Sequence, residues 1–250
     1  MKRRIPKRLK KEPLLEAVWE IRFGANSDVS VGEMLPGMLY QSLRERYPVT
    51  VRLPVADIPR PIAQQDKNLR YVPVVRMEGP LEAPFAIQVG DRMVSLNKRR
   101  PYSGWDEFSK RISELAQLLH STGLIQKPER FSLKYIDLIE LDTPPSLASL
   151  QVSLSAAGRD LGNRPVQLRT EINDDPFIHI LQVASPVDVV IDGKDRLQGT
   201  LVDIDTIHPA ADDFWSTLDQ GLNEAHDRSK RLFIDLLTDD ALASLEPVYE

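Results

Sequence analysis

The chain has 250 residues, of which 42% are hydrophobic and 28% are charged, and its formal net charge at pH 7 is -5. It contains no cysteine, which excludes disulfide bonds, iron–sulfur clusters and thiolate zinc sites. No stretch approaches the roughly 18 consecutive apolar residues of a membrane-spanning helix. The acidic total argues against broad coating of nucleic acid. We therefore expect a cytoplasmic globular protein.

Residues 1–12 form a basic segment that has few apolar residues and lacks the apolar core of a secretory signal. Such a segment can bury little surface, so the pattern predicts a mobile arm. A basic arm that touches nucleic acid or an acidic partner is the alternative. Its cations are Lys2, Arg3, Arg4, Lys7, Arg8, Lys10 and Lys11.

Residues 14–23 alternate between apolar and polar positions, which predicts a strand with one apolar face. Ser30 and Glu33 fit a capping box that begins a helix reaching about Tyr47, although Pro36 favours a later start. A short strand at 49–55 and a proline-rich loop at 58–68 follow. Three β-prone runs over 70–98 are close enough for an antiparallel meander.

A helix is predicted over 104–121, beginning at Ser103 or Gly104. Its apolar positions recur at three and four residues, so we expect Trp105 and Phe108 to face inward. The next strand, over 130–141, carries Asp137 on its more apolar face. Residues expected in the core are Trp19, Phe108, Ile112, Leu133, Phe214 and Leu222.

The second half repeats part of this plan. Residues 146–157 suit either a helix or a strand, and four strands are expected between 165 and 207. A long helix over 211–237 and a short one after Asp239 complete the chain. The sequence predicts an α+β fold of antiparallel sheets with two long packed helices. The halves, 13–142 and 143–250, share an order of elements that suggests duplication within one packed unit.

Four stretches together resemble a sporadically distributed, functionally uncharacterised family of bacterial proteins of about this length. They are PLLEAVWEIRF, MVSLNKRRPYSGWDEF, RFSLKYIDLIEL and HDRSKRLFIDLLTDDAL. The resemblance spans most of residues 13–245 and implies no reaction, cofactor or catalytic residue. It implies that the position of Asp137 is often asparagine in the family. The patchy occurrence of the family is typical of mobile or defence-linked genes.

Sequence motifs of common enzymes are absent: there is no phosphate-binding glycine loop, no nucleophile elbow and no HExxH. One metal-like set stands out, since Asp203 and Asp205 share a strand face and His208, Asp212 and Asp213 follow. The solvent face of a strand before an acidic helix start explains the same residues without a metal. We favour that interpretation and expect no metal and no cofactor.

Asp137 is the least expected polar residue of the chain. A buried carboxylate needs a partner or a raised pKa. A perturbed acid in a pocket, with Glu20 or Glu140 nearby, is one interpretation. A structural carboxylate that pairs with an arginine or caps a loop is the interpretation we favour.

The turn after the strand at 92–98 is the candidate binding site of the sequence. Lys98, Arg99 and Arg100 precede Tyr102, so the cations could hold phosphates while the ring stacks on a base. A solvated turn explains the same residues. If the protein has a binding site, we expect it at this turn and the basic arm.

The sequence contains no convergent set of catalytic residues. We therefore expect a binding or interaction protein with a protein partner, as in a defence or toxin–antitoxin-like gene pair. Nucleic acid is a further candidate partner, and no membrane contact is expected. A metal-dependent hydrolase or nuclease built on Asp203, Asp205 and His208 is the alternative function.

Overall fold

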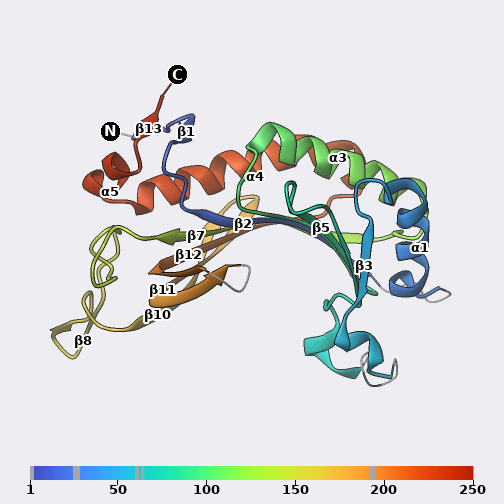
Figure 1. The fold of residues 1–250 in the computed structure, drawn as a ribbon, viewed down its shortest axis with the longest axis horizontal. Coiled ribbons are helices and arrows are strands. Elements are labelled where there is room, and N and C mark those ends of the chain that lie inside the picture. Colours follow the sequence, from blue (N-terminus) through green and yellow to red (C-terminus); the bar gives the residue numbers. More distant parts are fainter. Residues whose placement is uncertain (1–2, 25–28, 60–61, 63–64, 192–194, 250) are drawn as a thin grey trace. The chain divides into compact units, whose positions relative to one another are not determined.

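One antiparallel sheet of nine strands dominates the computed structural model, which describes residues 3–24, 29–59, 62, 65–191 and 195–249 (Figure 1). The strand order is β10-β11-β12-β7-β2-β6-β5-β4-β3. Its strands are β2 (Leu14–Phe23), β3 (Val49–Arg52), β4 (Val75–Glu78), β5 (Phe85–Val89), β6 (Met93–Arg99), β7 (Pro128–Ile139), β10 (Val166–Asp174), β11 (Phe177–Ile191) and β12 (Asp195–Pro209). The α+β class and the antiparallel pairing are confirmed.

The helices differ from the two long ones predicted. Within the described ranges, three helices have seven or more residues: α1 (Val31–Leu43), α3 (Trp105–Ser121) and α4 (Phe214–Leu236). The short α5 (Asp239–Ser244) follows, and η1 (Pro54–Asp57) and η2 (Lys67–Leu69) are 3-10 turns. Pro36 lies inside α1, five residues after its start. No described helix is long and apolar enough to cross a membrane.

The chain divides into two compact units, each made of separate segments. Unit 1 comprises Met1–Leu15, Lys134–Thr206 and Asn223–Glu250, and unit 2 comprises Glu16–Leu133 and Ile207–Leu222. In unit 1 both chain ends lie side by side, because β1 (Arg8–Leu9) pairs with β13 (Pro247–Val248) (Figure 1). A small hairpin of β8 (Ser155–Ala156) and β9 (Arg159–Asp160) also belongs to unit 1.

The core of unit 2 lies under α1 and α3. The six residues predicted to be buried are all at most 4% exposed. Phe108 of α3 stacks on Phe85 of β5 at 6.4 Å between ring centroids. Trp105 differs from the prediction, because it is only half-buried and meets the edge of Phe108. Gly104 is the N-cap of α3 with φ 94°, a left-handed conformation that a side chain would disfavour.

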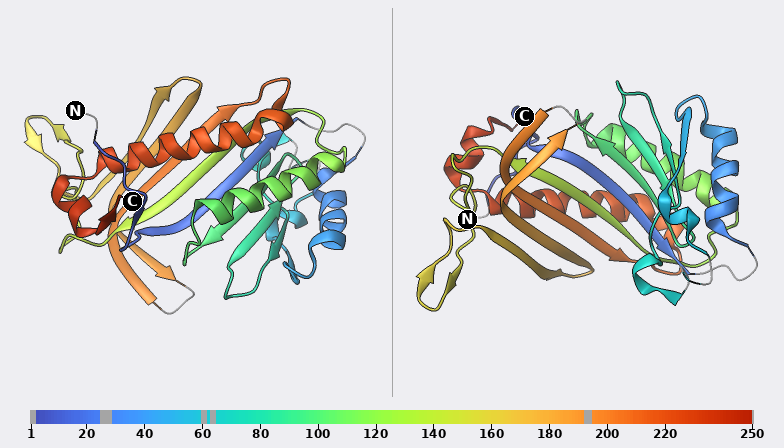
Figure 2. Two further views of the ribbon diagram at one scale, coloured as in Figure 1. Left: turned by 90° about the horizontal axis from the view of Figure 1, so that it is seen from above. Right: turned by 60° about the horizontal axis from the view of Figure 1, so that its bottom comes forward.

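The core of unit 1 is a separate apolar cluster. Figure 2 shows α5 and the last turns of α4 on one side of β7, β11 and β12. These elements meet through Ile139, Leu147, Leu150, Leu181, Val183, Val202, Ile204, Ile234, Leu237, Ala241, Leu242 and Leu245.

Two predicted strands of the second half are one strand. β11 runs from Phe177 to Ile191 through Ser185-Pro186, where the sequence suggested a break. The β10 ladder ends at the pair Val166↔Ser185, so the missing N–H of Pro186 leaves that ladder intact. Residues 146–157 suited either helix or strand. Residues 146–154 form neither, apart from a single bridge from Leu150 to Leu237, and the strand β8 follows at 155–156.

Candidate functional site

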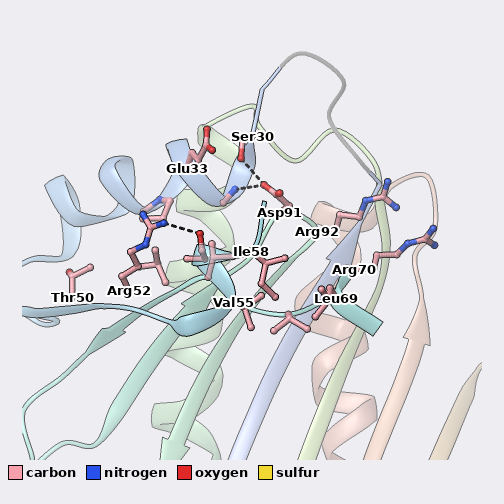
Figure 3. Close-up of a pocket in the computed structure, with 16 residues that line it drawn as sticks. Ser30, Glu33, Thr50, Arg52, Val55, Ile58, Leu69, Arg70, Asp91 and Arg92 are labelled. Atoms are coloured by element: carbon pink, nitrogen blue, oxygen red, sulfur yellow. Dashed lines mark hydrogen bonds between the residues drawn. The ribbon is translucent and has the colours of Figure 1, made fainter. Parts of the chain in front are cut away.

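A cavity of about 440 Å³ in unit 2 is the best candidate for a binding site (Figure 3). It lies between the first turns of α1, residues 50–75 and the tip of the β5–β6 hairpin. Apolar side chains line much of it, including Val55, Ile58, Leu69, Val72 and Val74. A cavity of this size lies within the range of small-molecule sites, about 300–1,000 Å³.

Asp91, at the hairpin tip, holds α1 at the edge of the cavity. Its Oδ1 accepts hydrogen bonds from Ser30 Oγ at 2.7 Å and from the backbone N of Gly32 at 3.1 Å (Figure 3). The predicted capping by Ser30 is therefore replaced, because Ser30 is the N-cap residue but its side chain makes no cap bond. The carboxylate of Asp91 satisfies a free N–H of the first turn instead.

Two glycines allow the walls to approach this closely. A Cβ at Gly32 would lie 3.0 Å from Asp91 Oδ1 and 3.1 Å from Val74. A Cβ at Gly90 would lie 2.5 Å from the backbone O of Val72, which no side chain could occupy without moving the wall. The cavity wall therefore requires glycine at position 90, whereas a side chain at position 32 would require Asp91 and Val74 to shift slightly.

The wall made by residues 53–58 and 69–74 is fixed to the sheet at both ends. Leu53 N donates to Val74 O at 2.9 Å, and Val74 N donates to Val89 O at 2.8 Å. Tyr71 OH donates to Glu129 Oε2 at 2.9 Å, and the Arg22 guanidinium lies 4.3 Å from the Tyr71 ring centroid. These contacts preform the wall that carries Leu69, which lowers the ordering cost of binding.

Some charged side chains at the cavity are paired within the protein, and others have no partner among the described residues. Arg52 donates to Ala56 O at 2.8 Å and pairs with Asp57 at 3.2 Å, so its guanidinium stabilises η1. The guanidinium groups of Arg70 and Arg92 make no hydrogen bond or ion pair with another described residue. Figure 3 shows both on the same side of the cavity, pointing past its edge in one direction. This side of the cavity therefore carries positive charge that no described residue neutralises.

Lys98, the first residue of the predicted binding turn, points into the protein. It is 3% exposed, and its Nζ lies 4.7 Å from the centroid of the Phe85 ring. Arg111 lies over the same ring at 4.4 Å. Burial lowers the pKa of Lys98, while the attraction of Glu107 acts in the opposite direction. Lys98 contributes to the core of unit 2 and not to a surface that a phosphate can reach.

The other predicted binding residues lie at the turn itself. Arg99 is exposed, Arg100 is half-buried, and the Tyr102 ring packs against Phe108 at 6.1 Å. The turn thus presents Arg99 and Arg100, without Lys98.

The basic arm, apart from Met1 and Lys2, which lie outside the described residues, contacts the C-terminal part of unit 1. Arg3 donates to the backbone O atoms of Ile234 and Leu237, both at 2.7 Å, and pairs with Asp239. Lys10 and Lys11 pair with Glu246 at 3.7 and 3.2 Å. Several cations of the arm are therefore neutralised within the protein.

The predicted metal set is not brought together. Successive side chains of a strand project to opposite faces, so His208 cannot share a face with Asp203 and Asp205. The His208 ring stacks on Phe131 at 5.2 Å. Within the described part of the chain, no group of three or more histidine and carboxylate side chains could hold a metal ion.

Asp203 and Asp205 instead share one cation. Lys134 Nζ lies 3.9 Å from Asp203 and 3.8 Å from Asp205, and Gln182 donates to Asp203 at 3.1 Å. Burial raises the pKa of Asp203, Lys134 lowers it and Asp205 raises it further. The Oδ1 atom of each carboxylate is buried and has no hydrogen-bond partner among the described residues. Negative charge therefore exceeds positive charge in this group.

Asp137 is 5% exposed, and burial together with the charges of Glu12 and Asp203 raises its pKa from 3.8 to about 8. Neither Glu20 nor Glu140, the neighbours expected from the sequence, contributes to this shift. The carboxyl group is thus largely protonated at neutral pH.

A hydroxyl–imidazole–carboxylate chain, buried at Thr206 and His179 but not at Asp174, was missed from the sequence. His179 Nδ1 lies 2.9 Å from Thr206 Oγ1, and Nε2 lies 3.4 Å from Asp174. Arg228 pairs with Asp174 at 2.8 Å. Burial opposes ionisation of Asp174, but the bonds from Arg228 and His179 hold its pKa below the ordinary value. Thr206 is 0% exposed, so this chain holds the fold of unit 1 and offers no nucleophile to a substrate.

One signal could have pointed to the cavity. Residues 53–74 connect β3 to β4, and long connections in compact domains are often functional. The roles of Asp91 and Arg92 had no sequence signal beyond a short turn between two strands. No model of a known protein family and no curated protein sequence matches this chain.

Proposed function

We propose that the protein is a non-catalytic binding protein whose ligand is a small molecule held in the cavity between α1, residues 50–75 and the β5–β6 hairpin. The observation that carries the proposal is this preformed apolar cavity. Its walls are fixed by Asp91, Tyr71 and the two glycines before any ligand arrives. A large apolar pocket with a few polar groups is the usual form of such a site.

The alternative function, a metal-dependent hydrolase or nuclease, has less support. It needs Asp203, Asp205 and His208 on one face, and the parity of the strand separates them. The group around Lys134 offers two carboxylates, one of them bonded to Gln182, and a lysine that competes with a cation.

A neutral apolar probe tests the proposed function. N-phenylnaphthylamine (NPN) fluoresces in apolar surroundings and carries no charge at neutral pH. We expect saturable binding of one NPN per chain to the native protein. The variant Ala56→Trp places an indole at the cavity wall and should abolish that binding. Ala243→Trp adds the same indole to an exposed position of α5 and should bind NPN as the natural chain does.

Native circular dichroism and unchanged melting temperatures establish that both variants fold. Absence of saturable NPN binding to the natural chain contradicts the proposal. Equal binding to both tryptophan variants also contradicts it, because the probe would then occupy another surface.

A protein partner is the second candidate, favoured by one observation on α1. Met34 and Met38, one helical turn apart, are 52% and 40% exposed. Methionine is common on surfaces that bind other proteins. The proposed partner is the product of an adjacent gene in a defence or toxin–antitoxin-like pair. Co-expression followed by size-exclusion chromatography should give a complex, and Met34→Glu with Met38→Glu should dissociate it.

Nucleic acid remains a proposal for the turn at Arg99 and Arg100. Replacing both with alanine should flatten the salt dependence of binding to short single strands, because fewer counterions are released. Binding that is absent at about 50 mM salt removes the proposal.

Membership of the sporadic bacterial family and duplication of the halves 13–142 and 143–250 are also proposals. Support for duplication comes from β6 followed by α3 and β12 followed by α4, which repeat a strand–helix order.

A further inference from the structure

We propose that the cavity ligand is an organic anion, with its apolar body against Val55, Ile58 and Leu69 and its acid group at Arg70 and Arg92. The inference rests on the proposed function and deepens it by assigning the chemical class of the ligand. It depends on the contrast between the apolar side chains that line much of the cavity and the two arginines at one side of it.

The two arginines differ from Asp91 and Arg52, two other charged groups at the cavity. Asp91 accepts a hydrogen bond from the first turn of α1, and Arg52 donates one to the backbone of η1. Arg70 and Arg92 are committed to no described residue, and their guanidinium groups point the same way at one side of the cavity (Figure 3). An arginine offers five N–H donors in a planar fork that suits carboxylate and phosphate oxygens.

The positions of both arginines are set by the fold. Arg92 follows Asp91 at the hairpin tip, where Phe23 N donates to the Arg92 backbone O at 3.1 Å. Arg70 precedes Tyr71, whose hydroxyl bonds to Glu129. Both guanidinium groups are therefore carried on anchored backbone, which limits the entropy lost when an acid group binds.

Charge complementarity favours an anion over a neutral ligand. The whole chain has a net charge of -5, so its net charge disfavours the approach of anions. Two cations that no described residue neutralises make this side of the cavity a local exception. A neutral apolar ligand would leave that charge unused, and a cation would be repelled by it.

Two probes separate the charge requirement from the cavity itself. Anilinonaphthalenesulfonate (ANS) combines an aromatic body with a sulfonate, whereas NPN has a similar body without the charge. We expect Arg70→Gln with Arg92→Gln to raise the Kd of ANS about tenfold, which corresponds to about 1.4 kcal/mol. The Kd of NPN should change less than about twofold, since its binding needs no cation.

Matched variants control for fold and total charge. Arg70→Lys with Arg92→Lys keeps the charge and should keep most of the ANS affinity. Arg159→Gln with Arg164→Gln removes the same charge from exposed positions of unit 1 and should leave ANS binding unchanged. Raising salt from about 50 to 500 mM should weaken ANS but not NPN, because exposed charges are screened.

Competition identifies the acid group. Decanoate and decyl phosphate should each displace ANS from the natural chain more strongly than decanol does, and the tighter of the two acids names the preferred group.

The outcomes distinguish the two proposals. If NPN binds and is lost in Ala56→Trp, but the glutamine pair leaves ANS affinity unchanged, the anion inference is wrong and the cavity proposal stands. Decanol that displaces ANS as well as both acids has the same meaning. If the glutamine pair weakens NPN as much as ANS, the anion inference is wrong, because the effect does not depend on the charge of the probe. If NPN does not bind to the natural chain, the proposed function itself fails.

Discussion

Buried charge is handled differently in the two units. In unit 2 a single ammonium, that of Lys98, lies beneath the Phe85 ring, with Glu107 supplying the opposite charge. In unit 1 the carboxyl group of Asp137 is surrounded by charges of its own sign, those of Glu12 and Asp203. Burial opposes ionisation in both places, yet only the ammonium has compensating partners. A buried charge with partners can persist, whereas one among like charges takes up a proton.

The largest expected loss of stability comes from removing the Phe85 ring, which contacts the Lys98 ammonium. Phe85→Ala deletes a 3% exposed aromatic that stacks on Phe108 and covers both Lys98 and Arg111. We expect the free energy of unfolding to fall by about 3–5 kcal/mol in urea titrations. Phe85→Leu keeps an apolar side chain and should cost less than half as much. Equal losses in both variants would show that the apolar bulk of leucine recovers nothing, and would contradict the smaller loss expected for Phe85→Leu.

The next effect is the pH dependence that Asp137 gives to stability. Its folded-state pKa of about 8 lies above the ordinary 3.8, so the native state holds a proton that the unfolded chain releases between these values. This contribution is fully present below pH 3.8 and is lost as the pH rises through 8. The slope is about 1.4 kcal/mol per pH unit, or about 3 kcal/mol from pH 5.5 to 7.5.

Asp137→Asn removes this titration and should become more stable relative to the natural chain as the pH rises. Urea unfolding at pH 5.5, 6.5 and 7.5 measures the difference. Asp235→Asn, at an exposed position of α4, is the control and should run parallel to the natural chain. Parallel curves for Asp137→Asn would show that the carboxyl group ionises normally.

A smaller effect is expected at Lys134, the cation that two carboxylates share. Lys134→Met leaves Asp203 and Asp205 without a cation and should cost about 2 kcal/mol. The double variant Lys134→Met with Asp203→Asn should recover part of the loss, because only one carboxylate remains. Lys67→Met, at an exposed position, should have no effect. A loss that Asp203→Asn does not reduce would contradict the proposed excess of negative charge.

The smallest effect is predicted for Lys98 itself. Lys98→Met keeps the apolar stem and removes the ammonium together with its burial cost. Loss of the cation–π contact lowers the free energy of unfolding, whereas removal of the desolvation cost raises it. The free energy of unfolding should therefore change by less than about 1 kcal/mol. Lys98→Ala also removes the stem and should cost more. A loss of several kcal/mol in the methionine variant would mean that the ammonium is held more strongly than its surroundings indicate.

The sequence predicted elements whose signals are local. Alternation located β2 and β7, and three-to-four spacing located α3 and α4, within a few residues. The same alternation, applied to β6, predicts that Lys98 faces inward, but its charge led to the opposite interpretation. Lys98 continues the face of Val94 and Leu96, so the period places it inward even though three cations in a row suggested a turn.

The cavity could not be derived from the sequence, because distant contacts build it. Residues 53–74 have no strong period, and their path depends on bonds to Val89 and Glu129. For the same reason Asp203, Asp205 and His208 looked like a metal set only until strand parity separated them. His179 and Thr206, which lie 27 residues apart, gave no sequence signal for their hydrogen bond.

The cap that Asp91 provides to α1 has one more consequence. It joins positions 59 residues apart, so the first turn of α1 is a property of the β5–β6 hairpin and not of the helix sequence alone. Arg92 is the next residue on that hairpin. A ligand that binds Arg92 should therefore restrict the motion of the neighbouring Asp91 carboxylate. Hydrogen–deuterium exchange at the Gly32 amide, which donates to that carboxylate, should then become slower when the ligand binds. The helix start would then serve as an internal reporter of occupancy, with no chromophore attached.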